Sequence, residues 1–288
     1  MYEGPILVFG SRGQLARSLN DWAIEKSVAM MLAGRPQFDI EKAGDIERTV
    51  VATRPKAIIN AAAYTAVDAA ETPEGRRDAW AANGAAVGAL ARVATQYGVT
   101  LVHISSDYVF DGTTERPYRE DDPVCPLGVY GQTKAAGDAL VATVPRHYIV
   151  RTSWVIGEGK NFVRTMASLA ERGVDPKVVD DQTGRLTFTD DLARGIRHLV
   201  STEAPYGVYN LTGGGEETTW ADIARRVFEL TGHDPARVTG ISTQEYFAAA
   251  TTPVAPRPRN SVLDLGKITE TGFAPADAEK LLADYLGG

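Results

Sequence analysis

The residues of this chain whose types and spacing are best suited to chemistry lie between Ser105 and Lys134. Tyr130 and Lys134 are separated by Gly-Gln-Thr, so on a helix the two side chains share one face. A phenol has a reference pKa of about 10 and is a poor acid–base group at neutral pH. An ammonium roughly 5 Å away, at an effective dielectric of about 20, would favour the phenolate by about 3 kcal/mol. That equals about two pKa units, so the spacing predicts that Lys134 makes Tyr130 a usable proton donor and acceptor.

A pair of hydroxyls precedes this motif. Val99–Ser105 is an apolar run typical of a buried strand, and Ser105 and Ser106 lie at its C-terminal end, followed by Asp107. A carbonyl held between a serine hydroxyl and the Tyr130 hydroxyl would be polarised for attack by a hydride. Because a Tyr and a Lys at this spacing also occur on many surface helices, the interpretation depends on the rest of the chain.

The N-terminus carries a glycine-rich turn. Pro5–Gly10 reads as a short buried strand, and Gly10, Gly13 and Ala16 follow the spacing Gly-x-x-Gly-x-x-Ala. Gly10 would allow a tight turn, Gly13 would let the backbone approach a pyrophosphate, and Ala16 would let the next helix pack close to the strand. The free amides of that helix would then face the phosphates. The pattern favours a dinucleotide site over an ordinary strand-to-helix turn, with cofactor contacts expected from Gly10, Arg12, Gly13, Gln14 and Leu15.

The second strand, expected over Val28–Leu32, indicates which dinucleotide is bound. Sites that prefer NAD usually end this strand with an acidic residue that binds the ribose hydroxyls, and none occurs between Glu25 and Asp39. Arg35, with Arg12, would instead receive the 2′-phosphate of NADPH. The alternative is that Arg35 is an exposed loop charge. Asp39 and Ile40 are expected beside the adenine.

Small residues follow the third expected strand, Ala57–Asn60. Ala61, Ala62, Ala63 and Tyr64 would let either a flat ligand or a neighbouring helix approach closely. Strands and helices alternate to about residue 152, which is typical of a parallel sheet with helices on both faces. Four segments fall at expected strand C-termini, where such sheets bind ligands: the Gly10 turn, Asn60, Ser105–Ser106 and Ser153–Trp154.

Beyond Arg151 the pattern is mixed. We expect helices over Asn161–Glu171, Thr189–Val200 (with Thr189 or Asp190 near its cap), Thr218–Leu230 and Asp277–Leu286, and short extended segments at Lys177–Val179, Val208–Leu211 and Val262–Leu265. The predicted fold is α/β: a doubly wound, Rossmann-like parallel sheet with a smaller mixed α/β substrate-binding lobe from the C-terminal part. We assign 1–152, with a returning segment at about 188–206, to the dinucleotide-binding domain, and 153–187 and 207–288 to the lobe.

Composition excludes several classes of function. With 44% hydrophobic and 23% charged residues among 288, the chain resembles an ordinary soluble globular protein. A net charge of -7 without a basic run argues against nucleic-acid binding. A single cysteine, Cys125, excludes an internal disulfide and a multi-cysteine zinc site. The absence of a leader and of a long apolar run predicts a cytoplasmic protein with no membrane contact.

Taken together, these segments resemble the extended short-chain dehydrogenase/reductases, and within them the dTDP-4-dehydrorhamnose reductases. The resemblance spans nearly the whole chain. The glycine turn and the Tyr130–Lys134 motif match the superfamily, and segments more specific to the branch are Asn60–Asp68, Ser105–Phe110, Arg151–Trp154, Asp181–Gly184, Thr218–Trp220 and Arg257–Ser261.

The resemblance implies the reaction and the role of each residue. NADPH, with NADH as a second candidate, would reduce the C4 ketone of dTDP-4-dehydro-6-deoxy-L-mannose to give dTDP-L-rhamnose. Ser106 and Tyr130 would hold the ketone, with Tyr130 as proton donor, while Lys134 would bind the nicotinamide ribose. Substrate contacts are expected from Val67, Ser105, Ser106, Tyr130, Trp154, Arg257 and Asn260. Read without the resemblance, Trp154 is equally a buried aromatic residue, and Arg257 and Arg259 are solvated loop charges.

The sequence departs from the branch at three positions. Ala16 replaces a glycine, Gly128 stands where Asn is usual, and Leu186 replaces a proline. Some members of the branch dimerise through acidic residues that bind Mg²⁺. No matching set is identified here, so Mg²⁺ binding and a homodimer are both left open, and no metal-ligating residue is assigned.

Two other functions compete with this one. A non-catalytic regulatory subunit, such as the methionine adenosyltransferase beta subunit, resembles these reductases and retains much of the cofactor site. An epimerase or 4,6-dehydratase that retains NAD is the other alternative. Dehydratases place an Asp-Glu pair after the catalytic hydroxyl, whereas here Asp107 is followed by Tyr108. A reductase of another 4-keto sugar nucleotide is a further alternative. The stereochemistry of the sugar is recognised by the geometry of the site, which the sequence does not show.

Overall fold

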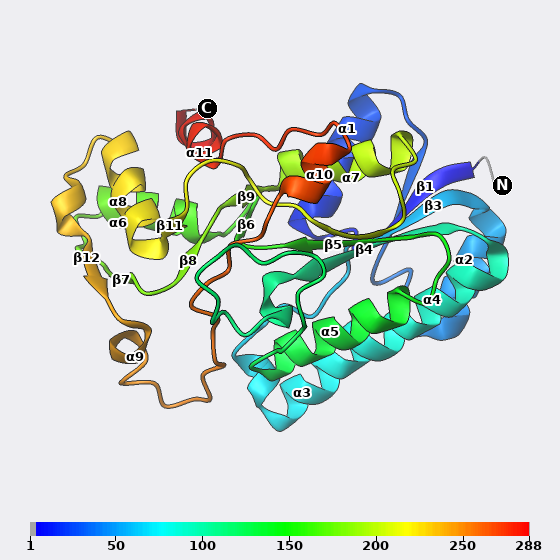
Figure 1. Cartoon of the computed structure of the whole chain (residues 1–288), viewed down its shortest axis with the longest axis horizontal. Helices are drawn as coiled ribbons and strands as arrows, with labels where there is room; N and C mark the ends of the chain where they lie inside the picture. Colours follow the sequence, from blue (N-terminus) through cyan, green and yellow to red (C-terminus); the bar gives the residue numbers. More distant parts are fainter. Residues whose placement is uncertain (1–3, 288) are drawn as a thin grey trace.

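A six-stranded sheet forms the centre of the molecule (Figure 1). The computed structural model describes residues 4–287. Neighbouring strands are all parallel, in the order β10-β5-β4-β3-β1-β2. Their bounds are β1 Gly4–Phe9, β2 Met30–Ala33, β3 Pro55–Asn60, β4 Thr100–Ser106, β5 His147–Thr152 and β10 Gly207–Asn210. The prediction of a doubly wound, Rossmann-like parallel sheet is confirmed.

Helices cover both faces of this sheet (Figure 1). On β1, Ile6 and Val8 pack toward one cluster of core residues, while Leu7 and Phe9 pack toward the other. Successive strand residues point to opposite faces, so a strand buried on both sides must be apolar throughout. This explains the continuous apolar runs in the sequence. The covering helices are α1 Gln14–Glu25 and α7 Thr189–Ser201 on one face, and α2 Ala43–Thr53, α3 Pro73–Trp80, α4 Ala86–Tyr97 and α5 Val129–Val141 on the other.

The strand order reverses between β1 and β3, which places a crevice at the C-terminal edge of the sheet. All four segments that we expected at strand ends do lie there. β1 ends one residue before Gly10, β3 ends at Asn60, β4 ends at Ser106 and β5 ends one residue before Ser153. The chain therefore delivers its candidate chemical groups to a single edge.

The part of the chain after β5 adds small elements beside this edge. Their apolar residues form a separate core that includes Val163, Leu186, Val227 and Phe228. The elements are β6 Val155–Ile156, α6 Phe162–Glu171, β7 Lys177–Val179, β8 Thr183–Gly184, β9 Thr187–Phe188, β11 Thr218–Thr219, α8 Trp220–Leu230, β12 Thr239–Ile241, α9 Thr243–Tyr246, α10 Gly266–Glu270 and α11 Ala278–Gly287. The division of the chain into two domains stays a prediction.

Several expected boundaries are wrong. β2 begins at Met30 rather than Val28. Thr218–Thr219 is a strand paired with β8, and α8 begins at Trp220 because the Thr219 hydroxyl accepts a hydrogen bond from the amide of Asp222. In Val262–Leu265 only an isolated bridge between Tyr118 and Leu263 forms. Helices α2 and α9 were not predicted.

The cap expected at the start of α7 is also different. Thr189 is already helical and Phe188 is the capping residue, with no side-chain cap bond. The Thr189 hydroxyl instead accepts a hydrogen bond of 2.8 Å from Ser18 on α1, so it joins the two helices on this face. Within residues 4–287, no helix has the length and apolar character needed to cross a membrane.

A buried ion pair ties α5 to β5 beneath the crevice. Arg151 donates from Nε to Asp138 over 3.2 Å, and both side chains are over 90% buried. A second guanidinium nitrogen of Arg151 donates to the carbonyl of Glu120 at 3.0 Å, and the group lies 5.1 Å from the ring of Phe110. Removing one member of such a pair leaves a buried charge without its partner, which is much costlier than losing an exposed pair.

We therefore expect Asp138→Ala to lower the free energy of unfolding by about 3–5 kcal/mol, because Arg151 stays buried without its counter-charge. Urea denaturation would measure this. Asp78→Ala, which removes an exposed pair with Arg77, is the control and should change stability by no more than about 0.5 kcal/mol. Similar effects of the two substitutions would contradict a structural role for the buried pair.

Candidate active site

Two adjoining cavities open at the C-terminal edge of the sheet. The first, of about 360 Å³, lies between the glycine turn and the loop after β2. The second, of about 560 Å³, lies between the glycine turn and the start of α5. Arg12, Gly13, Ala61 and Ala63 line both, so together the cavities form one elongated site of the kind that an extended ligand requires.

Gly10 makes the wall of this site close to the backbone of β3. Its φ is +99°, in the left-handed region, and an added Cβ would lie 2.7 Å from the amide nitrogen of Ala62. Only glycine satisfies both constraints without strain. Gly13 is the N-terminal cap of α1 and has no side chain to occupy the helix amides, and Ala16 is fully buried behind it. The free amides therefore face the cavity, as anion binding requires.

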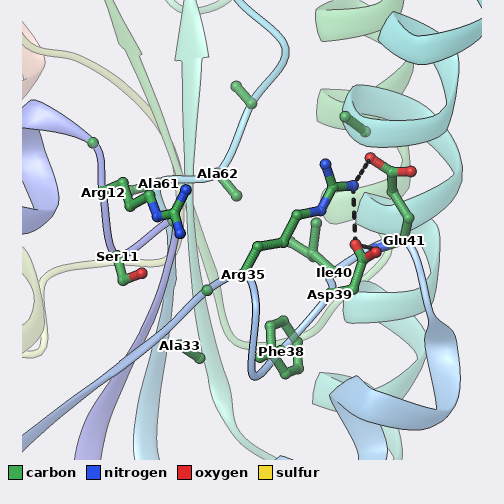
Figure 2. Close-up of a pocket in the computed structure, with 15 residues that line it drawn as sticks. Ser11, Arg12, Ala33, Arg35, Phe38, Asp39, Ile40, Glu41, Ala61 and Ala62 are labelled. Carbon is green, nitrogen blue, oxygen red and sulfur yellow. Dashed lines mark hydrogen bonds and ion pairs between the residues drawn. The ribbon is translucent and has the colours of Figure 1, made fainter.

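Arg35 lines the first cavity and is paired with two carboxylates. Its guanidinium lies 3.1 Å from a carboxylate oxygen of Asp39 and 2.7 Å from one of Glu41, as Figure 2 shows. Ile40 and Phe38 line the same cavity, and Arg12 enters it from the glycine turn. The loop after β2 folds back and brings Asp39 and Glu41 to the guanidinium. The role of Arg35 in binding the 2′-phosphate stays a prediction.

Buried amides hold the segment that follows β3. Asn60 is fully buried; its Nδ2 lies 3.0 Å from Nδ1 of His103 and its Oδ1 accepts from the amide of Ala62. Asn83 bonds both the amide and the carbonyl of Tyr64. Ala61, Ala62 and Ala63 consequently line the site, whereas Tyr64 does not line either cavity.

Ser106, Tyr130 and Lys134 come together in the second cavity. Glycines allow α5 to approach the end of β4: an added Cβ on Gly131 would lie 2.2 Å from the carbonyl of Tyr108, and one on Gly137 would lie 2.7 Å from that of Asn83. Lys134 is buried, and its ammonium donates to the carbonyl of Ile104 over 2.6 Å. Ser105, Val67, Gln14 and Leu15 line the same cavity.

The predicted lowering of the Tyr130 pKa does not occur. Burial raises the pKa of Tyr130 to about 12, and its hydrogen bond with Ser106 only partly opposes this. Burial also lowers the pKa of Lys134 to about 8, against the charge of Asp138. The helical spacing suggested an ammonium that stabilises a phenolate. The fold instead removes both groups from water, and desolvation disfavours the charged form of each. Tyr130 is therefore a protonated donor at neutral pH.

Unsatisfied polar atoms gather in this second cavity. Gln14 Oε1, Ser105 Oγ, Asp107 Oδ2 and Thr152 Oγ1 are all buried with no hydrogen-bond partner, and all four residues line it. Buried polar groups without partners are rare in folded proteins and destabilise them. Their concentration here indicates a site built for a ligand with several hydroxyl or carbonyl groups.

Trp154 forms another wall of this cavity. Its φ is +47°, which is uncommon for a residue with a bulky side chain. The ring stacks on Trp220 with centroids 3.9 Å apart. An added Cβ on Gly184 would lie 2.6 Å from the Trp154 ring, so glycine is needed there. A strained backbone held by a stacked partner and a close glycine indicates a residue whose position matters.

Two of the predicted substrate residues are not brought to the site. Arg257 pairs with Asp68 over 2.8 Å and lies over the ring of Phe247. Asn260 donates to the carbonyls of Thr114 and Arg116. Neither lines either cavity; both hold the loops around it.

The departures at Gly128 and Leu186 have structural explanations. An added Cβ on Gly128 would lie 2.7 Å from a carboxylate oxygen of Glu71. That carboxylate accepts from the amide of Val129 at 2.8 Å, so it takes the place of a capping side chain at the start of α5. Leu186 is buried in the C-terminal core.

Sequence reasoning missed several residues that line the site. Glu41 and Phe38 lie in the first cavity, and Asp107, Thr152 and Leu192 in the second. Asp107 follows the last residue of β4 and Thr152 is the last residue of β5, so their positions in the sequence could have predicted them as site residues. No sequence feature distinguishes Leu192, on α7, from other core residues. Across residues 4–287, no group of three or more His, Cys, Asp or Glu side chains is arranged to hold a metal ion.

Asp107 gives this site a pH dependence. Burial raises its pKa to about 6, and hydrogen bonds from Ser261 and Ser106 only partly oppose this. Because the folded-state pKa exceeds the unfolded value, the native protein binds more protons between the two values. Stability therefore falls as pH rises from about 4 to about 6.

We expect Asp107→Asn, which cannot ionise, to escape this loss. The stability of the variant relative to the native chain should increase by about 3 kcal/mol between about pH 4 and about pH 8, because two pKa units correspond to that energy. Urea denaturation at both pH values would measure the change, with the exposed Asp121→Asn as control. Parallel stability curves for native and variant would show that Asp107 titrates normally.

Comparison with known proteins agrees with the fold. Residues 4–287 match the family described as RmlD substrate binding domain. A dTDP-4-dehydrorhamnose reductase from Streptomyces griseus is 40% identical over 93% of this chain and 88% of its own length. A dTDP-4-keto-6-deoxy-D-glucose reductase from Streptomyces niveus is 38% identical over 93% and 91%. The crystal structure of a dTDP-4-dehydrorhamnose reductase from Bacillus anthracis in complex with NADP superposes with a TM-score of 0.90 at 29% identity, covering 99% of this chain and 98% of that one. The chain belongs to the RmlD substrate-binding-domain family, among dTDP-4-dehydrorhamnose reductases.

Proposed function

We propose that this chain is an NADPH-dependent reductase that converts the C4 ketone of dTDP-4-dehydro-6-deoxy-L-mannose to the hydroxyl of dTDP-L-rhamnose. One observation carries the proposal: Ser106, Tyr130 and Lys134 line a cavity that is continuous with the phosphate-binding turn at Gly10–Gly13. The name of the related reductase indicates the substrate, and the complex of a similar structure with NADP indicates the cofactor.

The residues present fit a dinucleotide. The free amides at the start of α1 and the close approach of Gly10 to Ala62 suit a pyrophosphate. Arg35, with Arg12, would hold the 2′-phosphate, while Asp39 and Ile40 would lie beside the adenosine. Lys134 would hold the nicotinamide ribose. When bound, NADPH supplies the hydride that the reduction requires.

The chain's own groups would handle the ketone oxygen. Tyr130 is protonated at neutral pH because burial raises its pKa to about 12, so its hydroxyl can give a proton to that oxygen. Ser106 lies beside it, and its hydroxyl donates to Asp107 at 3.0 Å. Turned from that carboxylate to the ketone, this hydroxyl would donate a second hydrogen bond, which stabilises negative charge that develops on the oxygen. Lys134 uses one N–H for Ile104, and its two remaining donors are available to the Tyr130 oxygen and to the ribose.

The unpartnered groups of the second cavity suit a sugar. Ser105 and Thr152 have hydroxyls without partners, and Gln14 has a free carbonyl oxygen. Trp154 would pack on the apolar face of the ring, with Val67 opposite. Arg257 and Asn260 would act indirectly, by holding the loops near the nucleotide, because the protein already occupies their polar groups.

The direct test is NADPH absorbance on addition of freshly generated dTDP-4-dehydro-6-deoxy-L-mannose. Loss of absorbance with dTDP-L-rhamnose as product is the expected result, without any added protein. The second candidate substrate is dTDP-4-keto-6-deoxy-D-glucose, the ketone of opposite configuration at C3 and C5. It is run alongside because the Streptomyces niveus relative is nearly as similar to this chain. Binding of NADPH without turnover of either sugar would overturn the proposal in favour of a regulatory subunit.

A cytoplasmic location and a homodimer stay predictions.

Tyr130→Phe should reduce kcat by about 100-fold or more, because it removes the proton donor while keeping the ring. KM for NADPH should change little. Steady-state kinetics would measure both, with Tyr246→Phe on the exposed helix α9 as the control. Turnover close to the native rate in Tyr130→Phe would refute the assignment.

The preference for NADPH over NADH should depend on Arg35, for which the carboxylates of Asp39 and Glu41 would compete with the 2′-phosphate. Arg35→Ala should raise KM for NADPH by about tenfold or more, because it removes a charge-assisted contact to the phosphate, and should leave KM for NADH nearly unchanged. Glu41→Gln should lower KM for NADPH, since one carboxylate that competes with the phosphate is removed. Equal effects on the two cofactors would show that Arg35 does not read the 2′-phosphate.

A further inference from the structure

A third cavity lies on the other side of helix α1 from the glycine turn. Its volume is about 590 Å³, and it shares no lining residue with the two cavities of the proposed active site. Residues of α1, α7, β1, β2 and β3 line it. Leu19, Val28, Met30 and Phe273 supply its apolar walls. The volume is in the range of sites that bind small organic molecules.

Two polar groups in this cavity lack partners. The guanidinium of Arg197, on α7, lies 4.4 Å from the ring of Trp22, on α1. The Nε of Arg197 and the indole Nε1 of Trp22 are both buried without a hydrogen-bond acceptor. Both atoms can only donate, and buried donors without acceptors are rare in native structures. The missing partner is therefore an acceptor.

The neighbouring charges leave Arg197 unbalanced. Arg194 donates to Asp191 at 2.8 Å and lies over the Phe273 ring, so it is already paired. His198 is hydrogen-bonded to Thr271. Glu25 acts on Arg197 through its charge but is held by Lys26 at 2.6 Å.

Lys56 adds a second positive charge at the rim of the cavity. Within residues 4–287, no carboxylate forms an ion pair with Arg197 or Lys56. In a chain of net charge -7, this is a local excess of positive charge.

We propose that this cavity binds a small organic anion with a flat apolar body and a single carboxylate or sulfonate group. The body would pack against Leu19, Val28, Met30 and Phe273. The anionic group would accept hydrogen bonds from Arg197, whose planar fork matches a carboxylate. Stacking on Trp22 already orients the guanidinium, so little side-chain freedom is lost on binding.

The test is calorimetric titration of the full-length chain with 2-naphthoate, with and without saturating NADPH. We expect a dissociation constant on the order of 0.1 mM that is the same in both titrations, and binding at least about tenfold weaker for the neutral isostere 2-naphthamide. Binding that NADPH abolishes would place the anion in the cofactor site and overturn the proposal. The titration without NADPH decides the question even if the chain does not reduce the sugar.

Variants locate the binding. Arg197→Met removes the charge and keeps an apolar chain of similar length, so it should weaken 2-naphthoate at least about tenfold. Arg172→Met, at the residue that follows α6, is the matched control and should bind as the native chain does. Val200→Trp keeps Arg197 but fills the cavity, and should abolish binding even if Arg197→Met fails to fold. No binding to the native chain up to about 5 mM, or equal binding by native, Arg197→Met and Val200→Trp chains, would refute the site.

Discussion

The close packing of α5 on the end of β4 is the constraint on which the candidate active site depends. Glycines at 131 and 137 leave no Cβ between the helix and its neighbours, so Lys134 can reach the carbonyl of Ile104. The same contact brings Tyr130 beside Ser106 in one cavity. Because a methyl group at Gly131 would collide with the backbone, the catalytic geometry depends on residues that do no chemistry.

Burial decides the electrostatics of this site more than pairing does. Tyr130, Asp107 and Lys134 all shift toward their neutral forms because desolvation disfavours charge. A ketone that fills the candidate site would therefore develop its negative charge beside buried, preorganised donors. Arg35 differs, because it is exposed and water screens its ion pairs with Asp39 and Glu41.

Among the described residues, six of the ten buried side-chain atoms without a hydrogen-bond partner belong to residues that line two of the cavities. Four of them surround the second cavity of the active site, which has a proposed polyhydroxyl ligand. Two more adjoin the cavity of Arg197 and Trp22, for which the proposed reaction has no use. The same physical reasoning, that a buried donor or acceptor implies a partner, applies to both. It predicts a hydroxylated ligand at one and an anion at the other.

Local patterns in the sequence were enough to predict the sheet, the glycine turn and the edge where the site lies. Apolar runs, glycine spacing and strand ends are properties of a few adjacent residues, so they can be read without coordinates. The conformations of loops and contacts between distant segments decided the rest. Glu41 reaches Arg35 within one loop, six residues along the chain, whereas Arg257 pairs with Asp68, which is 189 residues distant. The pKa of Tyr130 rises rather than falls because the surrounding core, which spacing on one helix does not reveal, excludes water from it.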